Sequence, residues 1–179
     1  PIYTIQGSGM ESALDGIFVA TEFVVVGDFQ VGGKSGFYLQ DQTGDGNPLT
    51  SDGIFVYYVG LNVNVGEYVR VHGYVDEYNG LTEITSVSQA WYWGAGDPIT
   101  PTVLSLPVGD VEEFEAYENM LVTFPQDLII SEYFNFDRYG EIVLTSQRHL
   151  TPTALFEPGS PEQALMAEFY LLDRITLDD

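Results

Sequence analysis

Short breaks rich in Gly, Asn and Asp divide the chain into apolar segments of strand length. The first half holds five such segments, at residues 17–29, 36–41, 53–59, 67–78 and 81–87. They are rich in Val, Ile, Phe and Tyr, the residue types that fit a pleated, half-buried strand. Asn79-Gly80 separates the last two segments, and this pair is a typical two-residue turn of a β-hairpin. The sequence therefore predicts a mainly β chain.

The segment 67–78 alternates most clearly between the two faces of a strand, with Val69 and Val71 on one face and Arg70 on the other. Glycines lie inside or at the edges of the segments, where barrel strands bend or bulge: Gly27, Gly66 and Gly73. The pattern favours a closed, antiparallel, five-stranded barrel, and the OB-fold is a small barrel of that kind. We expect residues 1–100 to form it.

The second half has a different composition. Residues 95–107 contain three prolines, which indicates a linker or a strand that changes lobe. After it we expect a helical turn at 111–117 and strands at 120–124, 128–132, 139–146 and 175–177. Ser160 is a helix cap, Pro161 fits the first helical position and Gln163 completes a capping box, so a helix should run to near Leu171. Residues 101–179 are thus expected to form a second β-rich, OB-like lobe with one helix.

The charge is very uneven, because 27 Asp and Glu stand against five Lys and Arg, for a formal net charge of −22. Nucleic-acid affinity depends on neutralising phosphates, and five scattered cations supply little of it. Any contact with DNA or RNA is therefore expected to be weak or indirect. Binding to an anionic membrane surface is excluded on the same grounds.

An acidic, solvated surface suits a salty or calcium-rich extracellular medium, where salt screens charges beyond about 8 Å. The chain has no cysteine, which excludes thiolate–zinc sites, cysteine nucleophiles and redox motifs. It has no apolar run of membrane-spanning length. With no basic and apolar leader, Pro1 is expected to begin a mature or excised fragment.

Residues 41–52 place oxygen-bearing side chains at the spacing of a calcium loop. The candidate ligands, at positions one, three, five, seven and twelve of that loop, are Asp41, Thr43, Asp45, the Asn47 carbonyl and Asp52. Gly46 falls at position six, where such a loop turns sharply. Flanking helices are not expected, and position twelve is Asp rather than Glu. The alternative is a polar hairpin loop whose side chains accept hydrogen bonds from its own backbone amides.

Catalytic candidates are few. His72 lies on the outward face of a predicted strand, and His149 follows Arg148 in a turn-like stretch. Neither has a neighbouring nucleophile or a metal-ligand spacing, so we expect no catalytic residue in this chain. Lys34, in the run Gly-Gly-Lys-Ser, does not form a phosphate loop, which needs a longer glycine spacing and a following helix.

Aromatic residues are abundant in the first lobe: Phe37, Tyr38, Phe55, Tyr57, Tyr58, Tyr74, Tyr78, Trp91, Tyr92 and Trp93. In OB-folds such rings can form stacking platforms for bases or sugars. The alternative, which we favour, is that they fill the barrel core and a seam against the second lobe.

Several segments taken together resemble the OB-fold region of the ExeM/NucH-type bacterial extracellular endonuclease family. The segments that carry the resemblance are Ile5-Gln6-Gly7, residues 36–46, 51–57 and 65–73, Tyr117–Val122, Arg138–Glu141 and Asp173–Asp179. The resemblance spans nearly the whole chain, and the order of the segments is more specific than any one of them. This chain is poorer in cations than a nucleic-acid-binding module should be.

The resemblance implies a secreted protein in which this region precedes an endonuclease/exonuclease/phosphatase catalytic domain on the same polypeptide. It implies a non-catalytic accessory role, in which the module stabilises or orients the nuclease domain and guides its substrate. The alternative from the residues themselves is a stand-alone, calcium-dependent binding module for carbohydrate or surface ligands.

Overall fold

The computed structural model describes residues 1–178, and these form two compact units. The first consists of Pro1–Thr102 together with Glu112–Val122. The second consists of Val103–Val111 and the chain from Thr123 onward. No helix among the described residues is both long and apolar enough to cross a membrane.

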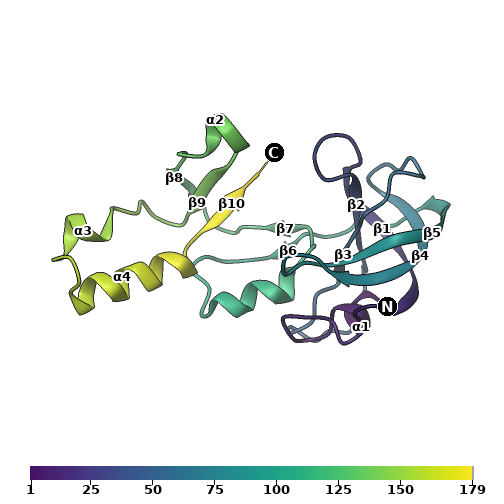
Figure 1. The fold of residues 1–179 in the computed structure, drawn as a ribbon, viewed down its shortest axis with the longest axis horizontal. Helices are drawn as coiled ribbons and strands as arrows, with labels where there is room; N and C mark the ends of the chain where they lie inside the picture. Colours follow the sequence, from purple (N-terminus) through teal and green to yellow (C-terminus); the bar gives the residue numbers. More distant parts are fainter. Residues whose placement is uncertain (179) are drawn as a thin grey trace. The chain divides into compact units, whose positions relative to one another are not determined.

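The first unit is built around a closed five-stranded barrel (Figure 1). Its strands are β1 (Phe18–Phe29), β2 (Gly36–Gln40), β3 (Gly53–Val56), β4 (Glu67–Glu77) and β5 (Thr82–Ala95). They follow one another around the barrel as β1-β2-β3-β5-β4, and all neighbours are antiparallel except β3 and β5. This arrangement is that of an OB-type barrel and confirms the predicted mainly β fold class.

The predicted turn and bulges lie where expected. Asn79 and Gly80 both have positive φ, 54° and 78°, as a tight hairpin turn of this type requires. Tyr78 and Leu81 exchange backbone hydrogen bonds of 3.0 and 3.1 Å across it. Gly27 lies at a register shift between β1 and β2. Gly73 lies at another between β4 and β5. β5 is longer than expected, because it continues to Ala95.

The barrel interior is filled by aliphatic side chains from every strand and by Phe37. Helix α1 (Ile2–Gln6), which the sequence did not indicate, adds Ile2 and Ile5 to this core. Gln6 extends the contact by donating a 2.7 Å hydrogen bond from Nε2 to the Gly53 carbonyl. The first residues of the chain are thus part of the barrel's packing.

Residues 112–122 belong to the first unit, although the predicted boundary places them in the second lobe. They include most of the short 3-10 helix η1 (Val111–Tyr117), whose bounds match the predicted helical turn. The backbone after it is held by barrel side chains. Ser51 Oγ donates to the Glu118 carbonyl, and Gln40 Oε1 accepts from Leu121 N at 2.8 Å. This return of the chain could not be seen in the local pattern.

The second unit contains an open three-stranded sheet in the order β10-β9-β8. Its elements are β8 (Ile129–Glu132), α2 (Phe136–Tyr139), β9 (Ile142–Thr145), α3 (Pro152–Leu155), α4 (Pro161–Leu172) and β10 (Ile175–Leu177). A further two-stranded sheet joins β6 (Thr102–Val103) to β7 (Val122–Thr123). The unit contains a sheet, as predicted, but the sheet is open rather than closed into a barrel, and the described residues of the unit form three α-helices where one was expected.

Helix α4 starts as its sequence predicts. Ser160 Oγ accepts from Gln163 N at 3.2 Å, and Pro161 occupies the first helical position. Gln163 Oε1 accepts from Gly159 N at 2.9 Å, one residue before the expected capping-box partner. The helix ends one residue beyond the expected Leu171.

Candidate binding cleft

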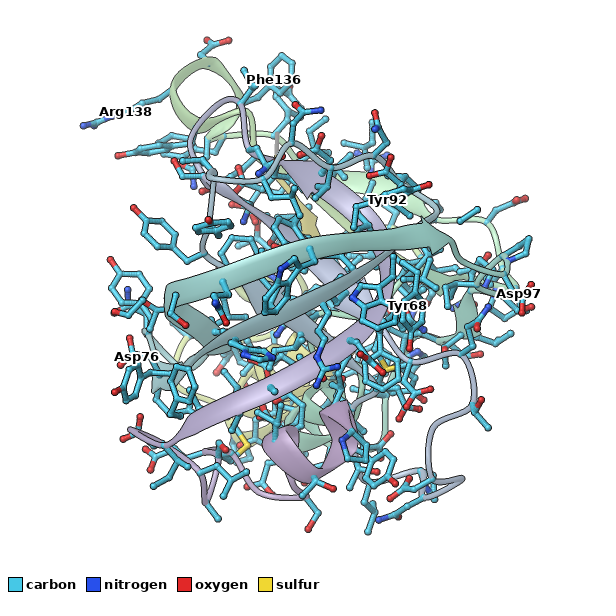
Figure 2. All side chains as sticks on the ribbon, turned by 90° about the vertical axis from the view of Figure 1, so that its right-hand side faces the viewer. Tyr68, Asp76, Tyr92, Asp97, Phe136 and Arg138 are labelled. Atoms are coloured by element: carbon cyan, nitrogen blue, oxygen red, sulfur yellow. The ribbon has the colours of Figure 1, made fainter. Side chains whose placement is uncertain are left out.

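A cleft of about 600 Å³ opens on the outer surface of the barrel. Ten residues line it: Gly33, Lys34, Tyr38, Phe55, Tyr57, Asp76, Tyr78, Leu81, Glu83 and Thr85. We call it the aromatic–acidic cleft. Figure 2 looks onto the barrel, with Asp76 toward one end of the β4 and β5 ribbons and Tyr68 and Tyr92 toward the other.

Strand register brings four of these residues into one row. Tyr38 on β2 pairs with Phe55 on β3, Phe55 pairs with Glu83 on β5, and Glu83 pairs with Asp76 on β4. Each of the four has at least one core residue beside it on its strand, so this row faces outward. Phe55 is nevertheless only 4% exposed and Glu83 7%. Outward-facing side chains with so little exposure indicate a recessed surface.

Two loops flank the row. The loop between β1 and β2 carries Lys34, and its backbone turns through Gly32 at φ 107° and Ser35 at φ 56°. The hairpin turn between β4 and β5 presents Tyr78 and Leu81. In OB-folds, the face of strands 2 and 3 and these same two loops form the ligand-binding surface. The cleft therefore lies where this architecture binds ligands.

The aromatic rings of the cleft are held against one another. The Tyr38 ring lies 5.6 Å from Phe29 in an edge-to-face arrangement and 4.9 Å from Phe55 in a tilted one. Two glycines leave room for these rings. A Cβ on Gly27 would stand 2.9 Å from the Phe29 ring, and one on Gly36 would overlap the Phe55 ring. The rings on the aromatic side of the cleft thus pack directly against the backbone at Gly27 and Gly36.

The acidic side of the cleft consists of Asp76 and Glu83. Burial, followed by the negative charge of Asp76, raises the pKa of the Glu83 carboxyl. Its oxygens are not among the side-chain atoms of residues 1–178 that are buried without a hydrogen-bond partner. They lie toward the cleft, where they are available as hydrogen-bond acceptors. With Lys34 on the opposite loop, the cleft offers both acceptors and a donor beside aromatic rings.

A second group of rings lies on the β1–β4–β5 surface. Phe18 contacts Tyr74 edge-to-face at 5.1 Å, and His72 contacts Trp91 edge-to-face at 4.9 Å. Trp91, Tyr92 and Trp93 are all exposed. The expectation that the aromatics fill the barrel core is therefore wrong for most of them, because the small barrel is filled by aliphatic residues and Phe37. The expected seam against the second lobe stays a prediction.

The predicted calcium loop joins β2 to β3, and its side chains turn back on its own backbone. Asp41 Oδ1 accepts from Thr43 N and Asp45 Oδ1 accepts from Asn47 N, each at 2.9 Å. Asn47 Oδ1 accepts from Leu49 N at 3.2 Å. These are the contacts of the alternative, the polar loop that satisfies its own amides.

Asp52 behaves differently from the other carboxylates of that loop. Burial, with the charges of Asp41 and Asp45, raises its pKa to about 6. Its Oδ1 is buried and accepts no hydrogen bond. Among residues 1–178, no group of three or more His, Cys, Asp or Glu side chains is arranged as a metal site. Calcium binding at this loop stays a prediction.

The two histidines have partners that the local sequence did not indicate. His72 packs against aromatic rings of the barrel surface. His149 Nε2 lies 2.8 Å from Asp173 Oδ2, and its ring stacks on Tyr170 at 3.8 Å. Asp173 is fully buried and its Oδ1 also accepts from Ser146 N at 3.0 Å. Asp173 and His149 therefore connect the end of α4 to the segment that follows β9, which gives both side chains a role in holding the fold together.

No family model matches the chain, and no curated protein matches it. Among solved structures, the chain is similar to the hypothetical protein ygiW from E. coli, at 19% identity and a TM-score of 0.33. The match covers 44% of this chain and 77% of that one. At this TM-score the match carries no argument, and the proposals below depend on the residues of the chain itself.

Proposed function

We propose that this chain is a non-catalytic OB-fold module of a secreted bacterial nuclease. The observation that carries the proposal is the closed OB-type barrel in the order β1-β2-β3-β5-β4. The resemblance of seven ordered segments to the ExeM/NucH-type family supplies the nuclease context.

In this proposal the module catalyses no reaction itself. Its partner is a catalytic nuclease domain of the same polypeptide, which it stabilises or orients. The histidine with the best-formed partner, His149, is used to hold α4 to β9. The acidic charge supports an extracellular location, and it makes direct, tight binding of DNA or RNA an unfavourable role for the module.

The parent reading frame beyond residue 179 tests this proposal. We expect it to encode a hydrolase domain with the metal-binding carboxylates, His and Asn of an endonuclease/exonuclease/phosphatase fold. We also expect the parent protein to be recovered from the culture medium. A frame that encodes no hydrolase domain, or a protein found only inside the cell, contradicts the proposal.

A further inference from the structure

We propose that the aromatic–acidic cleft binds uncharged sugar rings of an oligosaccharide. This goes beyond the nuclease role and does not depend on it, because it concerns only groups that the barrel itself brings together. Its ligand would be recognised by three kinds of groups at once: aromatic rings, carboxylate acceptors and one ammonium donor.

The rings supply the first kind of contact. Tyr57 is 53% exposed and Tyr78 is 61% exposed, and both border the cleft whose floor contains Phe55. The apolar C–H face of a pyranose can lie flat on such a ring, while the ring's phenol remains at the rim to make hydrogen bonds. A flat sugar ring could therefore stack on Tyr57 or Tyr78 at the rim of the cleft, or contact Phe55 in its floor.

The carboxylates of Glu83 and Asp76 supply the second kind of contact, which is hydrogen-bond acceptors. Glu83 is 7% exposed and lines the cleft, and its oxygens are not among the atoms of residues 1–178 that are buried without a partner, so they are available as acceptors on the cleft side. Asp76 lies directly opposite it in the β4–β5 pairing. Sugar hydroxyls can donate to both carboxylates, and a ligand that does so satisfies an acceptor that the fold leaves open.

The charges around the cleft select against anions and offer a neutral ligand both acceptors and a donor. An anion would meet Asp76, Glu83 and the field of a chain with net charge −22. Lys34, the only lysine of the chain, lies on the facing loop and adds a hydrogen-bond donor. A hydroxyl both donates and accepts, so a neutral sugar can use the carboxylates and the ammonium together. The volume of about 600 Å³ lies within the range of small-molecule sites, ~300–1,000 Å³.

The experiment is a calorimetric titration of the 179-residue chain with a panel of neutral oligosaccharides: cellohexaose, maltohexaose, mannohexaose and hexa-N-acetylchitohexaose. We expect at least one of them to bind. Glu83→Gln and Tyr78→Ala should each weaken that binding at least tenfold. The matched control is Tyr92→Ala, which removes a ring of similar exposure (56%) from outside the cleft and should change affinity less than twofold.

Folding is checked separately. Because burial disfavours the charged form of Glu83, Glu83→Gln should melt at the same temperature as the parent chain or higher. Loss of sugar binding by that variant then cannot be ascribed to unfolding. Oligo-dT and spermidine complete the panel as an anionic and a cationic probe, and neither should bind in the cleft.

Three results overturn the inference. The first is no binding of any of the four sugars at 10 mM, about the weakest level such a titration detects. The second is sugar binding that Tyr92→Ala abolishes and Tyr78→Ala leaves intact. The third is binding of oligo-dT or spermidine that Glu83→Gln or Tyr78→Ala removes. The outcome for the parent nuclease affects none of these.

Discussion

The ring of Phe55 on β3 lies over Gly36 on β2, in the space that a side chain at position 36 would occupy. A Cβ there would overlap both the Phe55 ring and the Val56 carbonyl oxygen. The backbone oxygen cannot move without disturbing the β2–β3 pairing, so the glycine is required by packing rather than by its backbone angles.

Gly36→Ala should therefore lower the free energy of unfolding by about 1–3 kcal/mol, the usual cost of overpacking a well-filled site. Urea denaturation measures this loss. Gly33→Ala is the matched control, since a Cβ on Gly33 meets nothing within 4 Å. A loss of stability as large in Gly33→Ala as in Gly36→Ala would show that the contact with Phe55 is not the cause.

The barrel should be more stable at pH 5 than at pH 8. Burial, opposed by a hydrogen bond from Thr82 N and reinforced by the charges of Glu115 and Glu77, raises the pKa of Glu118 to about 7. The folded state thus holds this proton more tightly than the unfolded state does. The contribution of protonated Glu118 to the free energy of unfolding is complete below pH 4.5, the pKa of this group in the unfolded chain. It is lost as the pH rises through the folded-state pKa of about 7.

Glu118→Gln removes this proton and keeps an oxygen for Thr82 N. The variant should melt higher than the parent chain at pH 8 and show a flatter dependence of melting temperature on pH. Glu113→Gln, at an exposed position of η1, should leave the slope unchanged. Equal slopes in the parent chain and in Glu118→Gln would refute the role of Glu118.

Calcium should raise the melting temperature through the loop of residues 41–52. Burial, followed by the negative charges of Asp41 and Asp45, raises the pKa of Asp52 to about 6. An ion bound only by the folded loop adds about 2.7 kcal/mol at ~100 times its Kd. Asp45→Ala should abolish the rise, Asp15→Ala should keep it, and Mg²⁺ should reproduce it poorly. Equal stabilisation by NaCl at matched ionic strength indicates simple screening instead.

The Asp173–His149 pair should be structural. Asp173→Ala leaves Ser146 N and the His149 ring without their buried acceptor, and we expect a loss of about 3 kcal/mol in the second unit. Hydrogen exchange at β9 and α4 measures it, and Asp127→Ala serves as an exposed control in the same unit. Unchanged protection of both elements in Asp173→Ala would contradict this.

Much of the barrel could be predicted from local pattern, because strands, bulges and the hairpin turn are set by neighbouring residues. The Asn79-Gly80 turn even fixes cross-strand partners: in a two-residue hairpin, Asp76 must pair with Glu83. The turn thus indicates from the sequence alone that the two acidic residues of the cleft meet. The aromatic residues Tyr38, Phe55, Tyr57 and Tyr78 are recognisable as ligand candidates by their type, but their gathering in one cleft depends on the pairing of β2 with β3 and of β3 with β5.

Other features depend on contacts between distant residues. α1 is too short to have a pattern of its own, and it is placed by Ile2 and Ile5 in the core. Residues 112–122 return to the barrel through hydrogen bonds with distant side chains: Gln40 Oε1 accepts from Leu121 N, and Ser51 Oγ donates to the Glu118 carbonyl. His149 finds its partner 24 residues away. No local spacing encodes these partners, because each is chosen by the packing of the whole unit.

The accessory role is tested most directly by DNA hydrolysis, measured side by side on the purified chain and on its parent protein. With supercoiled plasmid and either Mg²⁺ or Ca²⁺, we expect the parent to cut and the chain to leave the plasmid intact. Nicking by the chain that His149→Ala removes, or a parent protein without nuclease activity, would contradict the account.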